Sequence, residues 1–129
     1  MAKYPTEAEI RTGLTVPDPK DLWLVQHFLK FMGSHADLNQ IGAWMVLFLR
    51  QTGIKAIVSV DPNGRDSFDH NTRTITLATP SLVIALHEIG HAKFGRSELI
   101  ACQYSWSLIK WADPALFAKA VVNGHRLTL

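Results

Sequence analysis

The sequence predicts an α+β fold in which a small antiparallel sheet is flanked by N-terminal and C-terminal helices. Apolar residues recur at helical spacing between residues 19 and 51. Short segments rich in β-branched residues follow between residues 55 and 78. Helix-capping signals return from residue 79 onward. Because the helices and strands come in separate blocks, the expected fold class is α+β.

Two helices are expected in the first half of the chain. Asp18 can cap a helix that has Pro19 at its first position, and Gly33 follows the last apolar residue at helical spacing. A second helix is predicted over residues 37–51, with Gly53 beyond its end. The second helix is apolar on more than one face, so we expect it to be well buried.

Three short strands are expected next. Residues 55–60 are β-branched, and residues 67–68 begin a second strand after a turn that contains proline and glycine. In residues 73–78, threonines alternate with Ile75 and Leu77. This period of two predicts a half-buried strand, which we place at an edge of the sheet.

Helices are predicted again over residues 80–94, 98–111 and 114–123. Each follows a residue whose side chain can cap a helix N-terminus, and two of them also have proline at the first position. The capping residues are Thr79, Ser97 and Asp113. Gly95 and Gly124 are expected to end the first and the last of these helices.

A length of 129 residues predicts a single domain, residues 1–129, with one hydrophobic core. Residues 1–17 show no consistent period, so we expect an arm or short turns there. The N-terminus lacks the apolar segment of a signal peptide, and the longest apolar run, residues 41–49, is too short to cross a membrane. The only cysteine, Cys102, cannot form an internal disulfide. A cytoplasmic protein is therefore expected.

The charge distribution argues against nucleic acid as a partner. The net charge is +2, and the lysines and arginines are spread along the sequence without forming a basic stripe. An electrostatic nucleic-acid binder would carry a larger and more clustered positive charge. We expect neither a nucleic-acid nor a membrane partner, and the sequence does not indicate an oligomeric state.

The motif with the clearest chemistry is His87-Glu88-Ile89-Gly90-His91. Two histidines four residues apart on a helix lie on one face and can reach the same metal ion. Glu88 lies about 100° further round the helix, where it can reach a water molecule without binding the metal. This HExxH pattern predicts a zinc site with Glu88 as general base.

A third protein ligand is expected at a catalytic zinc site. Glu98 is our candidate, because it begins the next helix after a glycine turn, although an acid at that position also complements the helix dipole. The other possible ligands have ordinary structural interpretations, such as turn residues, a helix cap, a chain-end residue or a small buried thiol. These alternatives are Asp69, His70, Asp113, His125 and Cys102.

The run His87–His91, followed by Glu98–Ala101, resembles the HExxH and ExxA segments of gluzincin metallopeptidases. Residues 68–92 also resemble the small ImmA/IrrE-type zinc peptidases, in which a hairpin and an edge strand precede the active-site helix. The resemblance covers residues 55–105 and implies a minimal zincin-like domain. It further implies that His87, His91 and Glu98 bind Zn²⁺ and that Glu88 is the general base. The strand over residues 73–78 would then pair with an extended substrate.

The expected function is therefore hydrolysis of a peptide or protein substrate, with a single regulatory protein as one candidate. Two alternatives stay open: a zincin-like module that only binds protein, and a zinc amide hydrolase or deacylase that uses the same water chemistry. Metzincins are disfavoured because Ser97 stands where they have a third histidine. The candidate donors to the oxyanion are Arg96, Tyr104 and His125.

Overall fold

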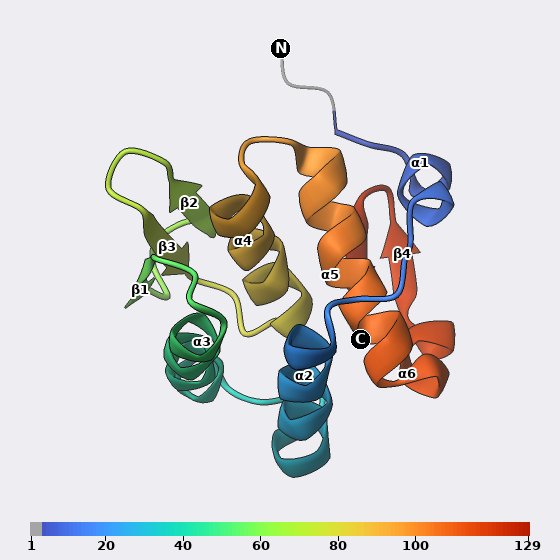
Figure 1. Cartoon of the computed structure of the whole chain (residues 1–129), viewed down its shortest axis with the longest axis horizontal. Coiled ribbons are helices and arrows are strands. Elements are labelled where there is room, and N and C mark those ends of the chain that lie inside the picture. The colour runs from blue at the N-terminus through green and yellow to red at the C-terminus, as the bar shows by residue number, and fades with distance from the viewer. Residues whose placement is uncertain (1–3) are drawn as a thin grey trace.

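A computed structural model describes residues 4–129, and among these residues it contains six helices and five strands (Figure 1). This confirms the α+β class. Two long helices precede the strands β1–β3 in the chain, and two follow them. The elements in chain order are α1 (Glu7–Thr12), α2 (Pro19–Met32), α3 (Leu38–Thr52), β1 (Ile57–Val60), β2 (Ser67–Asp69), β3 (Thr74–Leu77), α4 (Leu82–Phe94), α5 (Glu98–Ala112), α6 (Pro114–Lys119), β4 (Val121–Asn123) and β5 (Arg126–Thr128).

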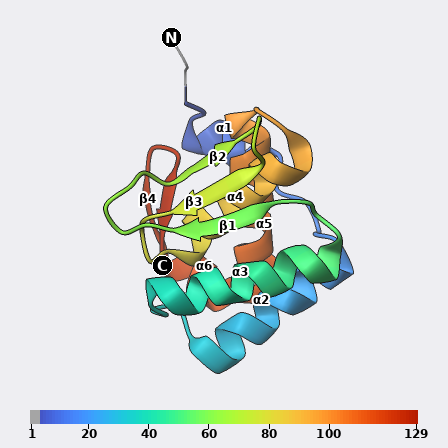
Figure 2. The ribbon, with the colours of Figure 1, turned by 90° about the vertical axis from the view of Figure 1, so that its left-hand side faces the viewer.

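Helix α4 lies at the centre of the molecule, between the three-stranded sheet on one side and α5 on the other (Figures 1 and 2). Its apolar side chains are buried almost all round the helix. They belong to the same hydrophobic cluster as the inward faces of α2, α3, α5 and β3. The core therefore holds the HExxH helix in place from several directions.

The three-stranded sheet has the order β1-β3-β2, with β1 parallel and β2 antiparallel to β3. The sheet is therefore mixed, and the prediction of a wholly antiparallel sheet was wrong in this respect. The prediction of an edge strand over residues 73–78 was also wrong, because β3 is central. Ile75 and Leu77 are fully buried from solvent, which fits a strand with neighbours on both sides. The free edges belong to β1 and β2.

The N-terminal part of the described chain contains a helix that the sequence analysis did not predict. Residues 7–12 form α1, so the expectation of an arm or turns over residues 1–17 was wrong for this part. Thr6 and Glu9 form a capping box at the start of α1, and Ile10 is fully buried. The side-chain amide of Gln103 on α5 also donates to the carbonyl of Glu9. The Thr-x-x-Glu spacing was a usable signal for this helix.

Helices α2, α3 and α5 agree with the predictions, including the N-caps Asp18 and Ser97. Asp37 is the N-cap of α3. Helix α4 starts later than predicted, because Ser81 and not Thr79 is its N-cap. The backbone N–H and the hydroxyl of Thr79 instead donate to the carboxylate of Asp66. The loop before α4 is thus tied to the β1–β2 connection.

The last predicted helix is shorter than expected. Helix α6 ends at Lys119, and Ala120 has an extended backbone. The chain then forms the antiparallel hairpin β4–β5, in which Gly124 occupies a turn position with φ of +65°. The prediction that Gly124 ends a helix was therefore wrong: its positive φ serves a hairpin turn, preceded by the β-branched pair Val121 and Val122.

Candidate metal centre

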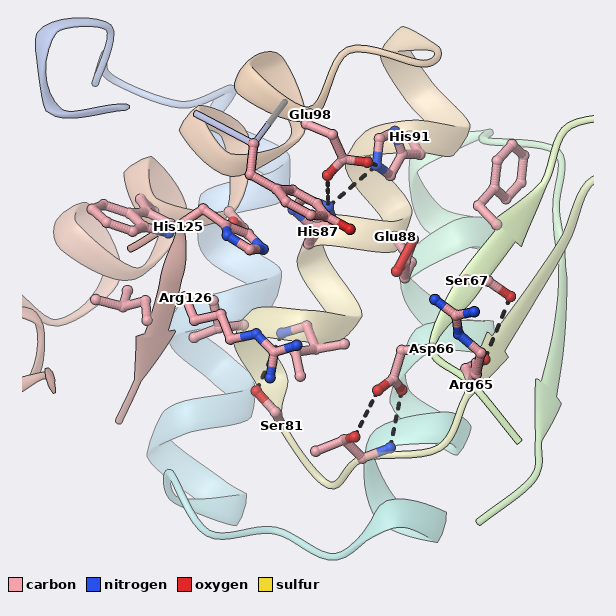
Figure 3. A pocket seen from close by; sticks show the side chains of 18 of the residues that line it. Arg65, Asp66, Ser67, Ser81, His87, Glu88, His91, Glu98, His125 and Arg126 are labelled. Carbon is pink, nitrogen blue, oxygen red and sulfur yellow. Dashed lines mark hydrogen bonds and ion pairs between the residues drawn. The ribbon is translucent and has the colours of Figure 1, made fainter. Parts of the chain in front are cut away.

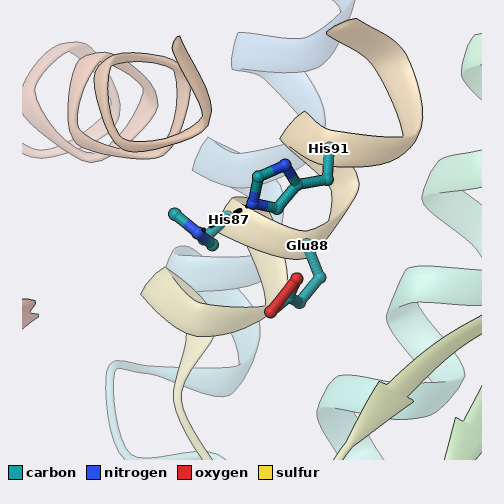
Figure 4. Close-up of side chains that lie close together, drawn as sticks. All are labelled: His87, Glu88 and His91. Carbon is teal, nitrogen blue, oxygen red and sulfur yellow. Dashed lines mark hydrogen bonds between the residues drawn. The ribbon is translucent and has the colours of Figure 1, made fainter. Parts of the chain in front are cut away.

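The two histidines of the HExxH motif point toward the same space. Because they are one turn apart on α4, their Nε2 atoms approach to 3.2 Å. Figure 4 shows His87, Glu88 and His91 extending from neighbouring turns of this helix. One ligand atom from each of these three residues lies within 4.8 Å of the others. Helical spacing alone accounts for this convergence.

Glu98 reaches the histidine pair from the first turn of α5. Its Oε2 atom lies 3.0 Å from Nε2 of His87, and its Oε1 atom lies 3.0 Å from Nε2 of His91 (Figure 3). The carboxylate therefore spans both rings with one oxygen on each. Of the third-ligand candidates, Glu98 is the one placed in this position by the turn over residues 95–97 and the close packing of α5 on α4.

The outer nitrogen of each ring has a partner that orients the ring. Nδ1 of His91 lies 2.7 Å from the carbonyl oxygen of Gly95. A carbonyl can only accept, so Nδ1 carries the hydrogen. In the neutral ring, the lone pair of Nε2 is then free to bind a metal ion in the space beside Glu98. Nδ1 of His87 lies 3.6 Å from Sγ of Cys102, which in turn lies 3.9 Å from the carbonyl oxygen of His125. A backbone carbonyl and a thiol thus hold the two imidazoles.

Burial shifts the pKa values of His87 and Glu88. Desolvation lowers the pKa of His87, although the neighbouring Glu98 carboxylate acts in the opposite direction. The neutral imidazole is the form that binds a metal ion. Desolvation also raises the pKa of Glu88 to about 8, and the carboxylates of Glu98 and Asp66 add to this shift. A cation among these groups would favour the charged form of Glu88.

The donor set fits a divalent transition-metal ion. Two imidazole nitrogens and a carboxylate are ligands that Zn²⁺ commonly takes, and a catalytic zinc site uses three protein ligands with one further open position. The pairwise distances of 3.0–3.2 Å among the donor atoms show that the side chains already converge without rearrangement of the backbone. The residues present therefore fit such an ion.

The histidine cluster lies in the wall of a pocket of about 820 Å³. Besides Tyr4, the lining comes from the β1–β2 connection with β2 and the turn that follows it, the β3–α4 loop, helix α4, the α4–α5 turn, helix α5 and the β4–β5 hairpin. Figure 3 shows these elements arranged around Glu88 and the histidines. The pocket has space for part of a polymer chain beside the candidate metal ligands.

Two of the alternative ligands lie beside this pocket. His70 lines it, and its ring centroid lies 6.2 Å from that of His91. His125 lines it from the turn of the β4–β5 hairpin, stacked on the ring of Tyr4 at 4.2 Å. Desolvation lowers the pKa of both histidines. Among the described residues, neither ring forms a hydrogen bond or an ion pair with Glu98, so both stand apart from the cluster of His87, His91 and Glu98.

The remaining candidate ligands, Asp69 and Asp113, form hydrogen bonds that stabilise a turn and a helix end. Asp69 accepts hydrogen bonds from the backbone of Asn71 and Thr72, which lowers its pKa. Asp113 caps α6 through the backbone N–H of Leu116. Of the candidate oxyanion donors, Arg96 lines the pocket. The hydroxyl of Tyr104 instead donates to Asp21 on α2 at 2.9 Å, so this residue belongs to the contacts between helices.

Several pocket residues were not identified from the sequence. Asp66 accepts from the backbone N–H groups of Ala78 at 2.6 Å and Thr79 at 2.9 Å, which fixes the β1–β2 connection against the start of α4. Tyr4, Arg65 and Arg126 reach the pocket from segments remote in sequence. None of these residues has a local motif, and tertiary structure alone brings them together.

Comparison of this chain with protein-family models, with curated proteins and with solved structures found no match. Among residues 4–129, no helix has both the length and the apolar character that a membrane-spanning helix needs.

Proposed function

We propose that this chain is a zinc-dependent metallopeptidase of zincin-like type, related in design to the gluzincins. The observation that carries the proposal is the meeting of His87, His91 and both oxygens of Glu98 within 3.2 Å, with Glu88 beside them in a pocket wall. A structural zinc site is normally closed by four protein ligands and needs no neighbouring base. Three ligands next to a buried glutamate favour catalysis.

His87, His91 and Glu98 would hold the ion. When bound, zinc supplies a Lewis acid that polarises the scissile carbonyl and lowers the pKa of a water molecule. Glu88 would accept a proton from that water and pass it to the leaving amine. Its buried position keeps competing solvent away from the carboxylate. His125 lines the same pocket and is our candidate hydrogen-bond donor to the oxyanion.

The free edge of the sheet supports the choice of a peptide as substrate. Strand β2 has a free edge, and its residues Ser67 and Phe68 line the pocket. An extended peptide could add to this edge by main-chain hydrogen bonds and pass the histidine cluster. Strand β3, which the sequence assigned to this role, is paired on both sides, so we transfer the role to β2. We propose a peptide or protein substrate in the cytoplasm, where the free thiol of Cys102 would stay reduced.

The test is hydrolysis of a pool of fluorogenic peptides by zinc-loaded protein. Glu88→Gln keeps the size of the side chain but removes its basicity, so we expect peptide hydrolysis to fall at least a hundredfold, within the range of general-base catalysis. Zinc content, measured in parallel, should be unchanged. Glu7→Gln, an exposed glutamate on α1, is the matched control and should retain activity. Undiminished hydrolysis by Glu88→Gln would refute the role of Glu88.

A further inference from the structure

Three arginines line the pocket, and the proposed hydrolytic chemistry uses none of them as a ligand or base. Arg65 comes from the β1–β2 connection, Arg96 from the α4–α5 turn and Arg126 from β5. In the view of Figure 3, Arg126 lies on one side of Glu88 and Arg65 on the other. Basic groups therefore reach the pocket from opposite walls.

The arginine side chains are exposed and available. Within residues 4–129, none of the three guanidinium groups forms an ion pair or a side-chain hydrogen bond. By contrast, Arg11 is paired with Glu7, and Arg73 donates to the carbonyls of Lys55 and Ala92. Unpaired guanidinium groups around a pocket are suited to bind carboxylates through two parallel hydrogen bonds.

The acids that line the pocket are Asp66, Glu88 and Glu98. Asp66 accepts three hydrogen bonds from Ala78 and Thr79, and Glu98 spans the histidine pair. Within residues 4–129, none of the three acids forms an ion pair with the three arginines. Arg96 and Arg126 add to burial in lowering the pKa of His70 and His125, respectively, as expected in a region of positive potential.

We infer that the pocket selects acidic peptides, with Arg126 and Arg65 binding Asp or Glu side chains on opposite sides of the residue presented to Glu88. This inference rests on the proposed function for the identity of the ligand as a peptide. A nucleic acid would also be attracted by arginines, but the net charge of the chain is only +2 and a free strand edge borders the pocket. Both features favour an extended acidic peptide.

The experiment measures binding without turnover, by fluorescence anisotropy with the full-length Glu88→Gln protein, with and without zinc. Three labelled ten-residue peptides share one sequence and differ only in whether aspartate, asparagine or lysine flanks the centre. We expect the aspartate peptide to bind about tenfold more tightly than the asparagine peptide and the lysine peptide to bind most weakly. Because the contacts are exposed, added salt should reduce the preference.

Single substitutions show which arginines cause the preference for the aspartate peptide. Arg65→Gln and Arg126→Gln should each reduce the preference for aspartate about threefold to fivefold, near the upper end for exposed charge pairs. Arg50→Gln, an exposed arginine on α3 outside this pocket, is the matched control and should leave the preference unchanged. Thermal melting of each variant checks that the fold is retained.

Equal affinity for the aspartate and asparagine peptides would overturn the inference. Displacement of the aspartate peptide by a much tighter-binding single-stranded oligonucleotide would also overturn it, in favour of nucleic acid. The outcome is separable from that of the proposed function. If the wild-type protein hydrolyses peptides but shows no charge preference, this inference alone fails. If it binds aspartate peptides selectively but hydrolyses none, the proposed function alone fails.

Discussion

The protonation of Glu88 links the chemistry of the site to the stability of the chain. In the metal-free protein, burial raises the pKa of this carboxyl from 4.5 to about 8. Between pH 4.5 and about 8, the Glu88 carboxyl is therefore protonated in the folded state but ionised in the unfolded state. A base of this kind must be ionised to act, and a nearby cation would lower its pKa. Under the proposed function, metal binding would therefore favour the ionised form of Glu88 that catalysis requires.

This coupling predicts the direction of a pH effect. Since the folded state binds more protons than the unfolded state, the free energy of unfolding should decrease as the pH rises toward about 8, by at most about 5 kcal/mol. The lowered pKa of His87 acts in the opposite direction, but only at acidic pH, where the unfolded histidine takes up a proton. The window from about pH 6.5 to 8 therefore isolates Glu88.

Urea unfolding of metal-free protein at pH 6.5, 7.25 and 8 would measure this effect. The wild-type protein should lose stability across the series, whereas Glu88→Gln, which cannot ionise, should lose much less. Equal slopes for the two proteins would show that Glu88 does not carry the shifted proton.

Cys102 is the second residue with a specific prediction, because its thiol lies 3.6 Å from Nδ1 of His87. Groups that orient metal-binding histidines typically affect metal affinity tenfold to a hundredfold. We expect Cys102→Ala to weaken zinc binding about tenfold, whereas Cys102→Ser, which retains a hydrogen-bonding group, should restore part of the loss. Isothermal titration of the three proteins measures this, and equal affinities would assign Cys102 to packing alone.

At the scale of elements, the site depends on how closely α5 packs against α4. A Cβ atom at Gly90 would lie 3.1 Å from Cα of Ala101 and 3.2 Å from Cδ2 of Tyr104. Tyr104 is also held by its hydrogen bond to Asp21, so it cannot easily move away. Gly90 therefore permits close packing of the two helices, which brings Glu98 to the histidines.

Gly90→Val should therefore destabilise the protein, by about 2 kcal/mol or more, even though valine has the better intrinsic helix propensity. Gly90→Ala should have a smaller effect of the same origin, because it adds one atom at the tight contact. Zinc affinity should fall with stability, since separation of the helices moves Glu98 away from His87 and His91. Thermal melting and zinc titration check both effects, and a stabilised Gly90→Val protein would contradict the packing argument.

The helices and strands also show which parts of the structure can be predicted from the sequence. Helix α4 and its histidine pair were predictable because helical spacing is local: it fixes the relation of His87 to His91 without reference to the rest of the chain. The sheet order was not predictable in the same way. The alternation in residues 74–77 shows that Ile75 and Leu77 face the core, but it does not say whether one strand or two lie beside them.

At the scale of the whole molecule, the pocket is built from segments far apart in sequence. Asp66, Arg65 and Arg126 reach it because the β1–β2 connection and the C-terminal hairpin both border the pocket (Figure 3). The hairpin was predicted as the end of a helix, so nothing in the sequence analysis placed Arg126 near Glu88. The candidate metal ligands on α4 were thus predictable from a local motif, whereas the rest of the pocket depended on tertiary structure.

The whole-molecule consequence of the proposed site is stabilisation by metal, because an ion that binds the folded chain and not the unfolded chain raises the free energy of unfolding. At a free zinc concentration a thousand times the dissociation constant, this amounts to about 4 kcal/mol. For a chain of 129 residues, the melting temperature should then rise by about 10 °C or more.

The most direct test of the central claim is therefore zinc binding itself, measured by elemental analysis and calorimetric titration of wild-type protein, His91→Ala and Glu98→Ala. We predict one zinc ion per wild-type chain, a higher melting temperature that a chelator reverses, and strongly weakened binding in both variants. Wild-type protein that binds no zinc, or that binds it equally well without His91 and Glu98, would contradict the account.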